Sequence, residues 1–252
     1  MLTLYFSGTG NSRYVALLLQ EHMGGACHSI EETLDFTALM RDTDRIAFVY
    51  PIYLSRLPRI LREFIKAHRE ALRGKKLIIL CTEMAFSGDG ARCFTDLLPN
   101  GSYEVVYAQH ITMPNNVNNM KMFPHQDAET VRNLTQDAQE TVAAICADIQ
   151  AGKVVKRGFG IKARLGGLPQ GLFVPFFDRL IRKSVWISAD CTGCGLCVRQ
   201  CPTHNLTLRG GKAVSGSRCT ACYRCINRCP RQAIGIYFRK KVNWQYQGIR
   251  EK

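Results

Sequence analysis

The sequence of 252 residues is long enough for one ordinary domain and a smaller module, and with 46% hydrophobic residues it can bury a full core, which excludes a disordered chain. The formal net charge of +14 is unevenly spread, because residues 1–150 carry 14 Lys and Arg against 17 Asp and Glu, whereas residues 151–252 carry 20 against 3. A basic half of this kind can attract nucleic acid, an anionic membrane or an acidic protein.

The start of the chain has no basic segment or cleavage site typical of a secretory signal, and no apolar run approaches the roughly 20 residues that span a bilayer. We therefore expect a cytoplasmic protein without a transmembrane segment. Twelve cysteines would suggest disulfides in a small secreted protein. In a reducing compartment, eight of them in short and regular spacings favour metal ligation.

The first 150 residues alternate β-type runs with helical patterns, which predicts a doubly wound α/β domain around a parallel sheet. We expect five strands, at 2–6, 26–30, 45–50, 77–81 and 103–108. Helices are expected at 11–22, 58–68, 91–98 and 127–150. Such sheets bind ligands at the carboxyl ends of their strands, so the loops after strands one, three and four are the candidate site.

The loop after the first strand combines two glycines with three hydroxyl side chains: Ser7, Gly8, Thr9, Gly10, Asn11 and Ser12. Backbone amides at a helix N-terminus and Ser or Thr hydroxyls together suit a phosphomonoester. The spacing fits neither the nucleotide P-loop nor the dinucleotide fingerprint. It resembles the first loop of the flavodoxins, and this resemblance covers about residues 1–150. It implies a flavodoxin-like fold and FMN with its phosphate at Ser7–Ser12.

The resemblance also implies that two further loops border the flavin ring. The loop after strand three would contribute Pro51, Ile52, Tyr53 and Leu54, with Tyr53 or Leu54 over one ring face. A packed loop aromatic is the alternative for Tyr53. The loop after strand four would contribute Thr82, Glu83, Met84, Phe86, Ser87, Gly88 and Asp89. An Asn-rich segment with Asn116 follows strand five, and it either borders the flavin or is an ordinary surface loop.

Residues 151–186 are basic and rich in glycine, and we interpret them as a connector. Within it, helical spacing predicts a short amphipathic helix from Phe173, Phe176, Phe177, Leu180 and Ile181. Interdomain packing is the favoured role of this helix. A helix that lies on a membrane surface or on a partner is the alternative.

Two cysteine quartets follow, 28 residues apart, and each ends in Cys-Pro: Cys191, Cys194, Cys197 and Cys201, then Cys219, Cys222, Cys225 and Cys229. They resemble the two-cluster bacterial ferredoxins over about residues 187–236, which implies an α+β domain with two [4Fe-4S] clusters. The crossed pattern of that family assigns Cys191, Cys194, Cys197 and Cys229 to cluster one. It assigns Cys219, Cys222, Cys225 and Cys201 to cluster two. Two zinc sites are the disfavoured alternative, and residues 237–252 form a basic tail without a clear period.

Nearly the whole chain is similar to the flavodoxin–ferredoxin fusion proteins of the EFR1 type. We expect a relay of electrons between the clusters and FMN, and on to an acidic redox protein. An alternative is an FMN-dependent reductase of a quinone or nitro compound, with His110 and His125 as candidates only because they are close to the expected pocket. A redox sensor or nucleic-acid-binding regulator is disfavoured, and peripheral membrane contact stays open. Four cysteines outside the quartets are expected to be small buried hydrophobic residues: Cys27, Cys81, Cys93 and Cys146.

Overall fold

The computed structural model describes residues 1–53, 56–85, 88–120, 122–237 and 239–249; of helical residues 168–175 and 177, the backbone alone is described. Three residues expected at the flavin, Leu54, Phe86 and Ser87, lie outside the described residues. No helix in the described part of the chain is both long and apolar enough to cross a membrane.

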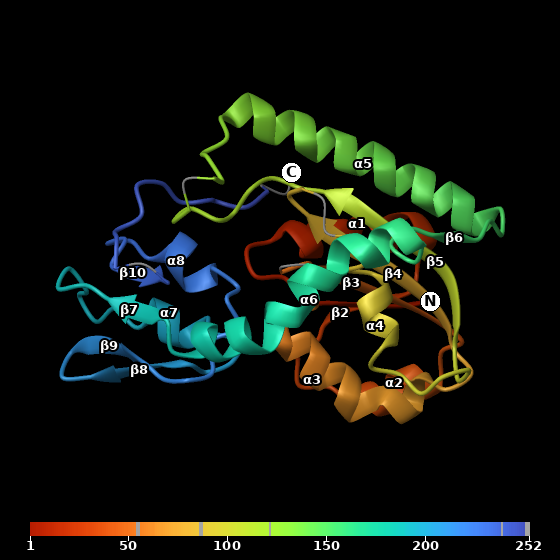
Figure 1. The fold of residues 1–252 in the computed structure, drawn as a ribbon, viewed down its shortest axis with the longest axis horizontal. Helices are drawn as coiled ribbons and strands as arrows, with labels where there is room; N and C mark the ends of the chain where they lie inside the picture. Colours follow the sequence, from red (N-terminus) through yellow and green to blue (C-terminus); the bar gives the residue numbers. More distant parts are fainter. Residues whose placement is uncertain (54–55, 86–87, 121, 238, 250–252) are drawn as a thin grey trace.

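The N-terminal domain is built on one parallel sheet with the strand order β2-β1-β3-β4-β5-β6 (Figure 1). Its strands are β1 (Leu2–Tyr5), β2 (Ala26–Ser29), β3 (Arg45–Pro51), β4 (Lys76–Glu83), β5 (Glu104–Thr112) and β6 (Val155–Lys156). The expected count of five strands was wrong, because β6 adds a sixth at the edge and pairs with Tyr107 and Ala108 of β5. Two residues are too few to show the period of a strand in the sequence.

Alternate residues of the strands pack on opposite faces of the sheet. On one face, Ala47 and Val49 of β3 pack with residues of α1 (Asn11–Met23) and α5 (Ala128–Gln150). On the other face, Ile46 and Phe48 pack with residues of α2, α3 and α4. These helices span Phe36–Arg41, Arg59–His68 and Arg92–Thr95, and the short 3-10 helix η1 (Arg69–Leu72) follows α3. Hydrophobic residues thus pack on both faces of the sheet, and because the strands are parallel, their carboxyl ends lie at the same edge.

The connector forms one long helix, α6 (Ile161–Arg182), so the expectation of a short helix near residues 173–181 was wrong. Its glycines look like helix breakers in the sequence, but Gly167 packs against the Asp89 carboxylate with no room for a side chain. Near the other end of α6, Asp178 forms an ion pair with Arg62 of α3. The helix therefore runs along the N-terminal domain and leads into the cysteine-rich domain (Figure 1).

The cysteine-rich domain, residues 185–236, consists of two small sheets and two short helices. Strand β7 (Val185–Ile187) pairs antiparallel with β10 (Ile234–Ile236), and β8 (Leu206–Arg209) pairs with β9 (Lys212–Ser215). The helices α7 (Leu196–Arg199) and α8 (Arg224–Arg228) each follow the first two cysteines of a quartet.

The 28-residue repeat is also visible in the backbone of this domain. Positive φ angles occur at Gly193 and Ala221, at Gly195 and Tyr223, and at His204 and Gln232, and each pair is 28 residues apart. The second repeat therefore adopts left-handed conformations with side chains that disfavour them.

The C-terminal tail, residues 239–249, returns from the cysteine-rich domain to the N-terminal domain, where its last described residue lies near α1 (Figure 1). Val242 and Tyr246 of this tail are buried, and Ile249 packs against the core between α1 and α5. The segment for which the sequence offered no role is thus part of the contact between the two domains.

Candidate cofactor sites

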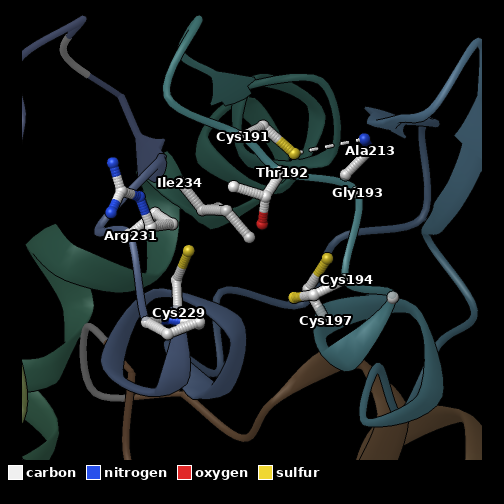
Figure 2. Close-up of a pocket in the computed structure, with 11 residues that line it drawn as sticks. Cys191, Thr192, Gly193, Cys194, Cys197, Ala213, Cys229, Arg231 and Ile234 are labelled. Atoms are coloured by element: carbon white, nitrogen blue, oxygen red, sulfur yellow. Dashed lines mark hydrogen bonds between the residues drawn. The ribbon is translucent and has the colours of Figure 1, made fainter.

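The eight quartet cysteines line two separate cavities. Figure 2 shows the first, where the sulfur atoms of Cys191, Cys194, Cys197 and Cys229 point into a shared space. The last of these four belongs to the second quartet, so the chain crosses between the two repeats. The structure thus brings three cysteines of the first quartet together with the last cysteine of the second.

The second cavity is lined by Cys201 from the first quartet and by Cys219, Cys222 and Cys225 from the second. Of the eight cysteines, Cys194 of the first cavity is exposed. In the second cavity, Cys222 is buried and also packs against the hydrophobic core of the N-terminal domain. The first cavity is therefore the outer one, and the second adjoins the N-terminal domain.

Backbone amides donate hydrogen bonds to sulfur atoms in both cavities. In the first, Ala213 N donates to Cys191 Sγ at 3.4 Å and Ala233 N donates to Cys229 Sγ at 3.3 Å. In the second, the amides of Ala221 and Asn205 donate to Cys219 Sγ at 3.3 Å and to Cys201 Sγ at 3.1 Å. Such bonds stabilise negative charge on sulfur and help to set the potential of an iron–sulfur cluster.

The electrostatics of the second cavity also fit a cluster. Burial raises the pKa of the Cys222 thiol to about 11 and that of Cys219 to about 12. The neighbouring sulfur atoms add to the rise, because each thiolate disfavours the next. Four thiolates in this space therefore need positive charge among them, and the iron ions of a cluster supply it.

The loop Ser7–Ser12, which the sequence assigns to a phosphate, lies between β1 and α1. Gly10 adopts φ +111° at the N-cap of α1, and its amide donates to Ser7 Oγ at 3.1 Å. Within the described residues, the amides of Thr9, Asn11 and Ser12 donate to no protein oxygen, although these three residues are buried. Buried donors without acceptors at a helix N-terminus are the features of an anion site, so this loop fits the phosphate of FMN.

Side chains from three other segments surround this loop. Asn116 Nδ2 donates to Thr9 Oγ1 at 2.7 Å, which brings Asn116 to the expected site. Ser12 Oγ and Thr82 Oγ1 share a hydrogen bond at 2.7 Å, so the end of β4 is also close. The hydroxyl of Tyr246 donates to Asn11 Oδ1 at 2.6 Å, a contact from the tail that nothing in the sequence predicted.

Tyr53, expected over a face of the flavin, has its hydroxyl near Cys222, which lines the second cavity. The pKa of this hydroxyl is raised well above its ordinary value, first by burial and next by the nearby Cys222. The hydroxyl has no hydrogen-bond partner among the described residues. Its neighbours Pro51 and Ile52 end β3, and Ile52 N donates to Thr82 O at 3.0 Å. Tyr53 therefore follows β3 and lies close to the second cavity.

The loop after β4 is fixed by ion pairs. Glu83, the last residue of β4, lies 3.0 Å from His110 Nδ1, and both side chains are buried. Asp89 is 2% exposed and forms ion pairs with Arg56 at 3.0 Å and with Arg92 at 2.6 Å.

The other residues expected at this loop and beside the flavin are also placed by the structure. Gly88 packs against the backbone of α6, and Met84 is half-buried. His125, the other candidate histidine, packs its ring against Trp244 of the tail. Both candidate histidines are thus held by protein side chains, and the loops after β3 and β4 are held together by Arg56.

Arg224 is the residue at this junction that sequence reasoning missed. It stands between two ligands of the second quartet, and its guanidinium donates to the carbonyls of Ser7 at 2.7 Å and Gly8 at 3.1 Å. It also donates to Gln200 O at 2.9 Å and forms two bonds to the Glu31 carboxylate, at 2.8 and 2.6 Å. The sequence gave no sign of this role, because Arg224 looks like a spacer residue between two cysteines and most of its partners are about 200 residues away.

Three of the four cysteines outside the quartets are buried, as expected of small hydrophobic residues, but Cys93 Sγ also accepts a hydrogen bond from the Arg56 guanidinium at 2.6 Å. Cys81, Cys93 and Cys146 are buried, and Cys27 is half-buried. Burial raises the pKa of the Cys93 thiol to about 12 and that of Cys27 to about 11. These two thiols stay protonated at neutral pH, which keeps them unreactive.

Comparison with protein families gives two matches. The family described as "Flavodoxin domain" matches residues 2–164, and the family described as "4Fe-4S dicluster domain" matches residues 190–233. The first match covers more than half of the chain and extends through β6 into the start of α6. No curated protein matches the chain.

Several solved structures resemble part of the chain. Oxidised flavodoxin 2 from Bacillus cereus is 16% identical and covers 58% of this chain and 97% of its own, with a TM-score of 0.39. The WrbA-like flavodoxin from Agrobacterium tumefaciens is 16% identical and covers 60% and 98%, with a TM-score of 0.40. The flavodoxin from Megasphaera elsdenii is 17% identical and covers 56% and 99%, with a TM-score of 0.34.

Proposed function

Because this chain belongs to the flavodoxin-domain family and also carries a 4Fe-4S dicluster domain, it is an electron-transfer protein that binds FMN and iron–sulfur clusters, and we propose that it relays electrons between two [4Fe-4S] clusters and FMN. When bound, the clusters exchange single electrons, whereas the flavin accepts one or two, so their combination gathers or divides electrons. The supporting observation is that the second cysteine cavity lies directly against the loop Ser7–Ser12.

Two contacts hold this arrangement in place, and a tyrosine hydroxyl lies beside them. The carbonyl of Cys222 lies against Gly8, where a side chain would overlap it. Arg224 reaches the carbonyls of Ser7 and Gly8 from the same ligand motif. The hydroxyl of Tyr53 lies near Cys222 at the same junction. These contacts keep the second cavity at a fixed position relative to the loop, which an efficient relay within one protein requires.

The position of the two cavities gives the relay an order. The ligand set of cluster two adjoins the N-terminal domain through Cys222, and the ligand set of cluster one includes the exposed Cys194. We therefore place cluster one at the outer end of the relay, where an external redox protein docks. Arg231 is exposed and lines the first cavity, and Arg199, also exposed, donates to Cys194 O at 3.3 Å. Both cations suit an acidic partner.

The relay is tested with anaerobically reconstituted protein that contains both clusters and FMN. Rapid mixing with a one-electron reductant is followed by absorbance changes of the clusters and of the flavin. We expect flavin reduction to follow cluster reduction at a rate that is independent of protein concentration and faster than in a mixture of separately produced halves. A flavin reduction rate that rises in proportion to protein concentration would show transfer between molecules and contradict the proposal.

A further inference from the structure

We propose that the C-terminal tail closes the phosphate side of the FMN site and thereby controls how fast FMN leaves. The proposal concerns retention of the cofactor, which the relay itself does not require. It rests on the contacts of residues 244–249 with the loop Ser7–Ser12.

Two residues of the tail contact the loop directly. The hydroxyl of Tyr246, a residue that is 7% exposed, donates to Asn11 Oδ1 at 2.6 Å. Gly248 lies over the loop, because a Cβ built on it would come within 3.1 Å of Thr9 O. Gly248 also adopts φ +82°, which favours glycine at this position. The tail thus packs on the loop Ser7–Ser12, whose amides without protein acceptors are the proposed donors to the FMN phosphate.

The tail is itself anchored to the cysteine-rich domain. The side chain of Gln245 donates to the carbonyls of Ile226 and Cys229, both at 2.8 Å. The amide of Tyr246 donates to Asn227 Oδ1 at 2.7 Å. Because Cys229 is a ligand residue of the first cavity and Asn227 belongs to α8, the tail connects the cluster domain to the phosphate loop.

The Asn-rich segment completes the enclosure from the other side. Asn118 Nδ2 donates to Trp244 O at 2.9 Å and to Asn227 Oδ1 at 3.1 Å. Asn227 Nδ2 in turn donates to Asn116 O at 2.9 Å, and Asn116 holds Thr9. The tail, the Asn-rich segment and α8 therefore form one hydrogen-bonded wall around the loop. A phosphate bound there leaves only after part of this wall opens.

The test measures dissociation of FMN from the reconstituted full-length protein after dilution, by the recovery of flavin fluorescence. Tyr246→Phe removes the hydroxyl that holds Asn11, and we expect FMN to dissociate about 3- to 10-fold faster, the effect of one lost buried hydrogen bond. A chain that ends at Val242 lacks the wall segment, and we expect a larger increase. The control is Tyr107→Phe, which removes the hydroxyl of another buried tyrosine, together with its hydrogen bond at 3.1 Å to Asp148, far from the loop.

Riboflavin, which lacks the phosphate, separates a local role from a general loss of structure. If the tail acts at the phosphate loop, Tyr246→Phe lowers the preference for FMN over riboflavin, while iron content stays at the level of the unchanged protein. An equal loss of both affinities, or an FMN dissociation rate that neither variant changes, overturns the proposal. Full-length protein that binds no FMN would instead contradict the function proposed above.

Discussion

The carbonyl oxygen of Cys222 lies so close to Gly8 that the N-terminal domain has no room for a side chain at this position. One of these residues belongs to the loop that we propose binds the FMN phosphate, and the other is a proposed ligand of cluster two. The two cofactor sites therefore share a backbone contact. Because neither partner of this contact is a flexible side chain, it fixes the separation of the sites more firmly than a surface ion pair would.

Gly8→Ala tests this contact. The φ angle of Gly8 is not in the left-handed region, so the added methyl group acts through its overlap with Cys222. We expect the interface to open more easily by about 1–3 kcal/mol, as is common for overpacking. Hydrogen exchange of amides at the interface measures this opening. The control is Gly160→Ala, where a methyl group meets nothing within 4 Å; equal effects of the two changes would contradict the prediction.

Arg224→Gln tests the second connection between the domains. The change leaves the carbonyls of Ser7 and Gly8 and the carboxylate of Glu31 without their guanidinium partner. The side chain of Arg224 is 18% exposed and that of Glu31 is 22% exposed, so the ion pair is largely shielded from water. Because removal of one partner leaves the other charge unpaired, we expect the interface to lose about 2–4 kcal/mol of stability. The variant should also slow electron transfer to FMN in the rapid-mixing experiment.

The control for Arg224 is Arg73→Gln, which breaks an exposed ion pair with Glu70. Such pairs contribute about 0–1 kcal/mol, so little change is expected. A double-mutant cycle with Glu31→Gln gives the part of the loss that belongs to the ion pair alone. If Arg224→Gln and Arg73→Gln destabilise the protein equally, the contacts of Arg224 do not stabilise the interface between the domains, and the prediction is contradicted.

The sequence predicted the parallel sheet, the positions of its first five strands and the two cofactor types, because each rests on local patterns. Strand alternation, the glycine and hydroxyl loop and the cysteine spacings are all readable within about 15 residues. What it missed depends on contacts between distant segments. Gly167 looked like a helix breaker, but α6 continues through it and packs against Asp89.

Tyr223 shows the same limit at the interface. It occupies the left-handed position that Gly195 has in the first repeat, and its hydroxyl donates to Asn119 Oδ1 at 2.8 Å. A repeat comparison shows the substitution but not its reason, since Asn119 is 104 residues away. Likewise, the tail has no period of its own, because its residues bond to or pack on other segments one at a time. Such contacts leave no pattern in one sequence.

The crossed assignment of the eight cysteines is tested with pairs of changes. Cys194→Ala and Cys229→Ala should each remove the same cluster and leave about four of eight irons, and so should the two changes together. Cys222→Ala combined with Cys229→Ala should remove both clusters. Iron and sulfide analysis of anaerobically reconstituted protein gives the result. Uncrossed ligation would exchange the results of the two double variants, because Cys229 and Cys222 would then bind the same cluster, whereas Cys194 and Cys229 would bind different clusters.

The outer position of cluster one is tested through the charge at its cavity. Arg231 is exposed and lines the first cavity, so Arg231→Glu reverses a charge next to the expected docking surface. We expect reduction by the anionic reductant dithionite to slow by about 3-fold at low salt, and reduction by a cationic viologen radical to become faster. Both effects should fade as salt screens the charges. The matched control is Arg132→Glu, an exposed position on α5, which should change neither rate. If Arg132→Glu changes the rates as much as Arg231→Glu, the reductants sense the net charge of the whole protein, and electrons do not enter preferentially at cluster one.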